Sequence, residues 1–331
     1  RSFLQIMNYL VSHRNKFLIK ENLFYLFTSF IYIYCENTNM ETCVGYVDKA
    51  LHQMAFSLSD FFYYFLVAVV QGITEFLPVS SSGHLVLLPE ILGNADQGLS
   101  IDVAAHIGTL LAVIIYVRSE IFKIYLALRN LILGKLYSNS ITIVDRRSIL
   151  IFNLIIIATI PIIIAGFFVS LYKIEFLRLV QTVAIANLIF ALFLWHSDKN
   201  HQNKQDLGQM GLKEAFFIGL AQMLAIIPGT SRSGVTITMA RYLGFGRIVA
   251  ARFSLLLSIP VIIAAGFLQT LELLKSENVF LINTALIVII ASFSVALAVI
   301  HAMMSWLRKR DFSWFVYYRL ALGFIILFVI Y

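Results

Sequence analysis

Long apolar stretches with almost no charged residues are the main pattern along this chain. A helix needs roughly 20 mostly apolar residues to cross about 30 Å of membrane hydrocarbon. Six stretches approach that length, and the only charged residues in them are Asp102 and Arg319. They are residues 101–117, 148–172, 179–195, 253–271, 279–306 and 312–331. The pattern therefore predicts an all-α, polytopic membrane protein with six transmembrane helices.

Two further apolar stretches are interrupted by proline and then by small polar residues. Residues 61–77 precede Pro78, and residues 215–227 precede Pro228. The sequences that follow are Val-Ser-Ser-Ser-Gly-His and Gly-Thr-Ser-Arg-Ser-Gly. Proline and glycine interrupt helices, and backbone freed inside a membrane must be buried in protein or line a cavity. We therefore predict two re-entrant helix hairpins, each with a polar tip.

The distribution of Lys and Arg predicts how the chain is oriented, because cytoplasmic segments are enriched in these residues. Residues 118–147 are rich in Arg and Lys and are predicted to be cytoplasmic. The basic residues 308–310 fall on the same side only if the second hairpin enters and leaves from the cytoplasmic face. By the same reasoning the first hairpin enters from outside.

The predicted order is a hairpin followed by three spans, twice over. Three is an odd number, so the second unit is inverted relative to the first, as in transporters that bind their substrates near the membrane midplane. We expect the repeats over about 58–196 and 212–331, within a single membrane domain of residues 54–331. Residues 1–53 are expected to be an N-terminal extension outside that domain.

Composition excludes several classes of protein. Of the 331 residues, 60% are hydrophobic and 13% are charged, whereas a soluble domain has roughly 45–50% apolar and about 25% charged residues. A soluble enzyme, a disordered chain and a nucleic-acid-binding module are therefore excluded. The net charge of +7 fits cytoplasmic segments beside a bilayer. Two cysteines are too few for a disulfide framework or a zinc site.

Polar residues inside apolar segments are candidates for function, because a buried charge costs about 2.5–3.5 kcal/mol in a membrane helix. Gln71 and Glu75 are four residues apart and share one helix face. They could hold a divalent cation or orient a water molecule, or they could form a buried pair that closes the hairpin. We favour function for Glu75 and leave Gln71 open.

The first tip combines the hydroxyls of Ser80, Ser81 and Ser82 with the imidazole of His84. Hydroxyl and backbone N–H groups bind phosphate oxygens, and histidine acts as a base or a nucleophile. One of the serines is expected only to cap the next helix. His106, on a predicted span, is interpreted as an ordinary buried histidine.

The second tip places Arg232 between Ser231 and Ser233 at the start of a predicted helix. These groups suit an anion, and the planar guanidinium suits a phosphate. Arg232 could instead pair with Glu75 as a structural lock, and the two roles are compatible. Arg319 is either a second phosphate ligand or a side chain that reaches the membrane interface.

Together these groups suit phosphoryl transfer from a lipid-linked phosphate, with cations neutralising the transition-state charge. The alternative is a transporter or flippase of an anionic lipid or a small anion. A carboxylate at the site favours the hydrolase, because an anion carrier gains little from a negative charge there.

Two sequence signatures resemble those of a known family. Residues 71–84, Gln-Gly-Ile-Thr-Glu-Phe-Leu-Pro-Val-Ser-Ser-Ser-Gly-His, resemble the first signature of the undecaprenyl-diphosphatase, or bacitracin-resistance, family. Residues 228–234 resemble its second, and residues 102–109 and 318–319 also fit. The resemblance covers about 54–331. It implies hydrolysis of undecaprenyl diphosphate to undecaprenyl phosphate and inorganic phosphate, which recycles the lipid carrier for cell-wall synthesis and confers bacitracin resistance.

The resemblance also implies residue roles and a location. Catalytic roles fall to Glu75, His84, Arg232 and Ser81, and phosphate contacts to Ser80, Ser82, Ser231, Ser233 and Arg319. Glu75 and Gln71 are expected to hold a divalent cation, Mg²⁺ or Ca²⁺. The location is the bacterial plasma membrane, with the active site open to the outer face. The nucleophile (His84, a serine or water) and formation of a homo-oligomer stay open.

Overall fold

A computed structural model describes residues 58–92, 98–133, 143–172, 179–199, 204–275 and 282–330. Within these ranges the chain consists of helices joined by turns, and the only β-type pairing is one isolated bridge between Lys204 and Phe245. This confirms the predicted all-α class. The chain divides into two compact units, Arg1–Tyr64 and Phe65–Tyr331, and the second carries the features discussed below. The predicted extension, residues 1–53, lies outside the described residues.

Five helices in the described ranges are long and apolar enough to cross a membrane. They are α6 (Leu99–Tyr116), α8 (Ile143–Tyr172), α9 (Val180–Asp198), α12 (Arg247–Lys275) and α13 (Ile282–Leu307). Each contains most of one predicted span, so the protein is a multi-pass membrane protein. The sixth predicted span corresponds to α14 (Ser313–Ile330), whose apolar part, Ser313–Phe328, is shorter. Its crossing of the bilayer stays a prediction.

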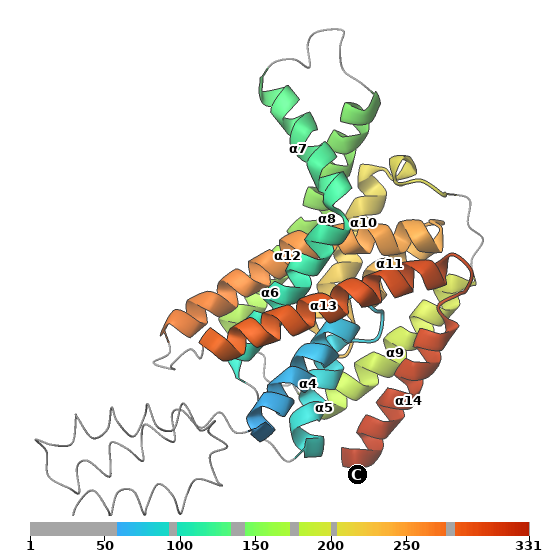
Figure 1. The fold of residues 1–331 in the computed structure, drawn as a ribbon. Helices are drawn as coiled ribbons and strands as arrows, with labels where there is room; N and C mark the ends of the chain where they lie inside the picture. Colours follow the sequence, from blue (N-terminus) through green and yellow to red (C-terminus); the bar gives the residue numbers. More distant parts are fainter. Residues whose placement is uncertain are drawn as a thin grey trace, which may run out of the picture. The chain divides into compact units, whose positions relative to one another are not determined.

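The basic connection between the first two spans is more ordered than its sequence suggested. Helix α7 (Arg118–Ile132) follows α6 directly and packs against the first part of α8 (Figure 1). Helix α8 begins at Ile143, five residues before the predicted span at Ser148. Charged residues in its first turns extend the helix beyond its apolar part, which is the only part that hydropathy detects.

Both predicted hairpins are helix–break–helix pairs. In the first, α4 (Leu58–Thr74) is followed by the break at Pro78 and then α5 (Ser81–Leu92). In the second, α10 (Leu212–Met223) continues into the 3-10 turn η5 (Leu224–Ile226), and α11 (Arg232–Tyr242) follows the break at Pro228. Their entry into the membrane from opposite faces stays a prediction.

Helices of one predicted repeat pack largely on helices of the other. Helix α6 packs against α12 and α13, α10 packs against α8, and α9 packs against α11 and α14. Glycine permits several of these close approaches. A Cβ added at Gly219 of α10 would lie 2.6 Å from the carbonyl oxygen of Ala158 in α8, and small residues are typical where membrane helices meet.

A buried ionic cluster joins the ends of four helices. Asp198, the last residue of α9, accepts hydrogen bonds from Arg241 Nε at 2.9 Å and from Arg247 Nε at 2.8 Å. It also accepts the backbone N–H of Phe312 at 3.1 Å. Arg241 is fully buried, and its other nitrogens donate to the carbonyls of Asp198 and Phe245. The cluster therefore ties α9 to α11, α12 and the start of α14.

Candidate active site

The two polar tips meet through an ion pair between residues 157 positions apart. Arg232 Nη2 lies 2.8 Å from Glu75 Oε1. The other carboxylate oxygen, Glu75 Oε2, accepts a hydrogen bond from Gln71 Nε2 at 2.8 Å and one from Ser81 Oγ at 3.3 Å. The structure therefore brings together Gln71, Glu75, Ser81 and Arg232. It contains the ion pair between Arg232 and Glu75 that was one of the two predicted roles of Arg232.

Further hydrogen bonds fix one tip against the other. Ser233 Oγ donates to the carbonyl of Leu77 at 2.8 Å, and the N–H of Gly229 donates to Ser82 Oγ at 3.1 Å. Each bond joins a side chain of one tip to the backbone of the other. The relative position of the tips therefore does not depend on the ion pair alone.

The tips share an unusual backbone conformation. Ser80 and Ser231 have φ values of 73° and 71°, and they are the only non-glycine residues with positive φ in the described ranges. Each directly precedes a helix, and each hydroxyl lies 3.2 Å from that of the serine two residues later. Such a conformation costs about 1–3 kcal/mol and persists only where its surroundings enforce it. By this geometry Ser81 corresponds to Arg232.

A cavity of about 210 Å³ opens where the tips meet. Its polar lining is Glu75, Ser80, Ser81, Ser82, Ser231, Arg232 and His106, and its apolar lining comes from α8, η5 and α12. Glu75 and Arg232 are nearly buried, with side-chain exposures of 7% and 12%. One acid, one cation, hydroxyls and an imidazole thus face the same cavity.

His106 of α6 was not selected as a site residue, yet its ring lines this cavity. His106 Nδ1 lies 2.7 Å from the carbonyl oxygen of Asp102, so Nδ1 carries a proton. Nε2 of the neutral ring is then a proton acceptor, and it has no partner among the described residues. The rotation of α6 puts His106 in the cavity, and a single apolar span in the sequence does not reveal that rotation.

His84 does not line the cavity. Its Nδ1 lies 2.7 Å from the carbonyl of Ser80, and its Nε2 lies 2.6 Å from the hydroxyl of Tyr318. The rings of His84 and Tyr318 are parallel within 3°. Both ring nitrogens are therefore engaged at the back of the first tip, and the catalytic role of His84 stays a prediction.

Arg319 is fully buried and holds the second tip from behind. Its Nε donates to Asn187 Oδ1 at 2.8 Å, and its Nη2 donates to the carbonyls of Gly229 and Thr230 at 3.0 Å each. Position 229 requires glycine here, because its φ is 91° and because a Cβ would collide with the carbonyl of Val183. Arg319 therefore does not reach the membrane interface, and its contact with phosphate stays a prediction.

Comparison with known proteins identifies the family. The model of the family described as "Bacitracin resistance protein BacA" matches residues 64–325. The chain belongs to the BacA family. A relative named "Undecaprenyl-diphosphatase" from Saccharophagus degradans is 45% identical over 264 residues, which is 80% of this chain and 96% of the relative.

Two other relatives are also named "Undecaprenyl-diphosphatase". The protein from Dinoroseobacter shibae is 42% identical over 271 residues, 82% of this chain and 98% of its own length. The protein from Alteromonas mediterranea is 42% identical over 266 residues, 80% of this chain and 97% of its own length. The family resemblance that the two signatures indicated is thereby confirmed.

The donor atoms of this BacA chain fit a cation that is shared with a substrate. No group of three His, Cys, Asp or Glu residues suited to a metal occurs in the described part of the chain. Gln71 Oε1 is buried beside Glu75 and has no hydrogen-bond partner among the described residues. Mg²⁺ is commonly held by one or two carboxylates together with substrate phosphates. Glu75 supplies one such carboxylate at the cavity, whereas Gln71 is fully buried and is not among the residues that line it, and the cation stays a prediction.

Proposed function

We propose that this protein hydrolyses undecaprenyl diphosphate to undecaprenyl phosphate and inorganic phosphate. The observation that carries the proposal is the Glu75–Arg232 pair in a hydroxyl-lined cavity, in a chain whose BacA relatives are named undecaprenyl-diphosphatase. The reaction recycles the lipid carrier for cell-wall synthesis and so confers bacitracin resistance. The protein acts in the bacterial plasma membrane, with the cavity open to the outer face.

Arg232 and the tip serines bind the terminal phosphate. A phosphate with two negative charges competes with the Glu75 carboxylate for the guanidinium, which binds phosphate in a planar, bidentate way. Binding of the substrate thus transfers Arg232 from Glu75 to phosphate and frees Glu75 Oε1. The guanidinium that pairs with Glu75 in the substrate-free protein therefore binds the phosphate in the complex.

Glu75 then serves as the proton acceptor. Ser81 Oγ already donates to Glu75 Oε2, so this carboxylate is in place to take a proton from Ser81 or from a water molecule there. The oxygen that has lost its proton, Ser81 Oγ or that of the water molecule, attacks the terminal phosphorus. The bond from phosphorus to the bridging oxygen breaks, and undecaprenyl phosphate leaves with the electron pair. If Ser81 attacks, water releases the phosphate in a second step. Both routes consume one water molecule.

The two histidines contribute differently. His106 Nε2 is a second proton acceptor inside the cavity. His84 supports the first tip through the Ser80 carbonyl, and its Nε2 can act on the substrate only after it releases the Tyr318 hydroxyl.

Glu75 and the free Oε1 of Gln71 would hold Mg²⁺ or Ca²⁺. When bound, the ion neutralises negative charge on the diphosphate.

Phosphate release from undecaprenyl diphosphate by detergent-purified protein tests the proposal. We expect release with Mg²⁺, loss of release with a chelator, and no release from Glu75→Ala. The matched control is Glu214→Ala, which removes a carboxylate outside the cavity. Release by Glu75→Ala at the wild-type rate would contradict the assignment. Lipid phosphate flux across liposomes without hydrolysis would instead support the carrier alternative.

A further inference from the structure

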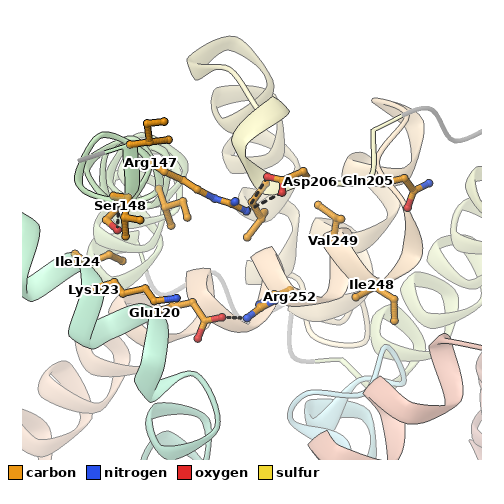
Figure 2. Close-up of a pocket in the computed structure, with 14 residues that line it drawn as sticks. Glu120, Lys123, Ile124, Arg147, Ser148, Gln205, Asp206, Ile248, Val249 and Arg252 are labelled. Atoms are coloured by element: carbon orange, nitrogen blue, oxygen red, sulfur yellow. Dashed lines mark hydrogen bonds and ion pairs between the residues drawn. The ribbon is translucent and has the colours of Figure 1, made fainter. Parts of the chain in front are cut away.

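A second cavity, of about 390 Å³, lies at the other end of the helices that form the candidate active site. Figure 2 shows it between the first turns of α7, α8 and α12 and residues 205–207. Ile151 of α8 lines it, whereas Ile162 lines the candidate active site. At 1.5 Å per residue, these positions are about 16 Å apart along the helix. The two cavities share no lining residue, so the second one is a separate site.

The polar groups of this cavity favour an anion. Arg147 Nη2 contacts both carboxylate oxygens of Asp206, at 2.7 and 2.8 Å, and on the opposite side Arg252 pairs with Glu120 (Figure 2). Each arginine uses only Nη2, and its other N–H groups have no partner within the described ranges. Lys123 also lines the cavity and has no ion-pair partner there. The lining therefore contains three cationic and two anionic side chains, and the N–H groups without a described partner are those of the cationic side chains.

Apart from Ser148 and Gln205, the rest of the lining is apolar, and the position of the cavity matches the polar edge of a bilayer. Helices α8 and α12 are both candidate spans, and the cavity is formed by their first turns. Ile143 and Val144, at the start of α8, are 86% and 53% exposed. Cationic pockets between membrane helices at the polar edge of a bilayer bind lipid headgroups. A free phosphate would use the donors alone, whereas a lipid would also cover these apolar side chains.

We propose that this cavity binds the phosphate headgroup of an anionic membrane lipid, with Lys123, Arg147 and Arg252 as the donors. The first methylene groups of the lipid lie against Ile143 and Val144. By the distribution of basic residues, the lipid comes from the cytoplasmic leaflet. The site is independent of the hydrolysis proposed above, because it shares no residue with the candidate active site.

The test is native mass spectrometry of the detergent-purified protein titrated with phosphatidylglycerol or, for comparison, phosphatidylcholine. We expect preferential binding of phosphatidylglycerol. Each Lys or Arg near an anionic headgroup contributes about fivefold, so Lys123→Gln combined with Arg147→Gln should weaken phosphatidylglycerol binding about 25-fold. Lys123→Gln alone should weaken it about fivefold, and it removes no described ion pair. The matched control is Arg129→Gln, on the same helix α7 but outside the cavity.

Three outcomes would overturn the proposal. They are unchanged binding in the double variant, an equal loss in Arg129→Gln, and displacement of phosphatidylglycerol by millimolar inorganic phosphate, which would make free phosphate the ligand. Glu75→Gln should bind phosphatidylglycerol like the wild type. The proposal therefore stands or falls separately from the diphosphatase activity.

Discussion

The two tips have the same backbone and different chemistry. Ser80 and Ser231 take the same rare conformation, and each precedes a helix whose first residue points to the shared cavity. That first residue is the hydroxyl-bearing Ser81 in one tip and the cationic Arg232 in the other. Three residues before each proline, the first tip has Glu75 and the second has Ala225, and both line the cavity. A repeated backbone conformation therefore presents a carboxylate from one tip and a guanidinium from the other.

The largest expected effect comes from removing the cation of the second tip. Arg232→Ala should lower kcat/KM by about 10³-fold, since Arg232 is the only Arg or Lys among the described residues that line the cavity. It should also lower the free energy of unfolding by about 3–5 kcal/mol, because the Glu75 carboxylate stays buried without its partner. Phosphate release and thermal melts measure the two effects, with exposed Arg310→Ala as the control.

A double variant separates the clamp from the lock. Adding Glu75→Gln to Arg232→Ala removes the unpaired charge, so thermal stability should return while activity stays absent. Recovery of activity in the double variant would show that Arg232 serves only to neutralise Glu75.

The next effect concerns the imidazole between the tips. His106→Asn should lower kcat by about 100-fold and leave KM nearly unchanged, because Nε2 is a proton acceptor and not a substrate anchor. His301→Asn is the matched control, since His301 Nδ1 also bonds the carbonyl four residues earlier, at 2.9 Å, outside the cavity. Equal kinetics for both variants would remove His106 from the mechanism.

A smaller effect distinguishes the two serines. Ser231 Oγ accepts the N–H of Gly234 at 3.1 Å and so caps α11. Ser231→Ala should therefore lower the free energy of unfolding by about 1 kcal/mol, and Ser80→Ala by less. The backbone strain is the same in both, so it cancels in the comparison. Melts in one detergent measure the difference, and a larger loss in Ser80→Ala would contradict it.

The smallest effect lies at the start of α10, which leads into the second tip and is not among the candidate spans. The hydrogen bond from Lys204, at 2.8 Å, lowers the pKa of Glu214 below its usual value. This stabilisation is present above the unfolded pKa and is lost as the pH falls through the lowered folded value. The pair is partly exposed, so Lys204→Gln should cost only about 0.5 kcal/mol at neutral pH. In melts, that difference should shrink toward acidic pH, and a constant difference would exclude the pair as its source.

How far the sequence predicts this molecule depends on the scale of the feature. Hydropathy located five spanning helices, because burial in lipid requires length and apolarity alone. It missed α7, whose mixed surface has no such signature. The cost of a charge in a membrane pointed to Glu75 and Arg232, and the structure pairs them. That cost does not say which way a side chain faces. Only the packing of the helices shows that Arg319 lies behind the second tip, that His106 lines the cavity, and which residues pair with Asp198.

Asp198 makes the two predicted repeats depend on each other. Its carboxylate lies at the end of α9, just after the first predicted repeat, while Arg241, Arg247 and the N–H of Phe312 all belong to the second. The acid and its cations are therefore supplied by different halves of the chain. Separating the halves would leave the fully buried Arg241 without its carboxylate, which is strongly destabilising. Two fragments cut between α9 and α10 are thus expected to fold only together.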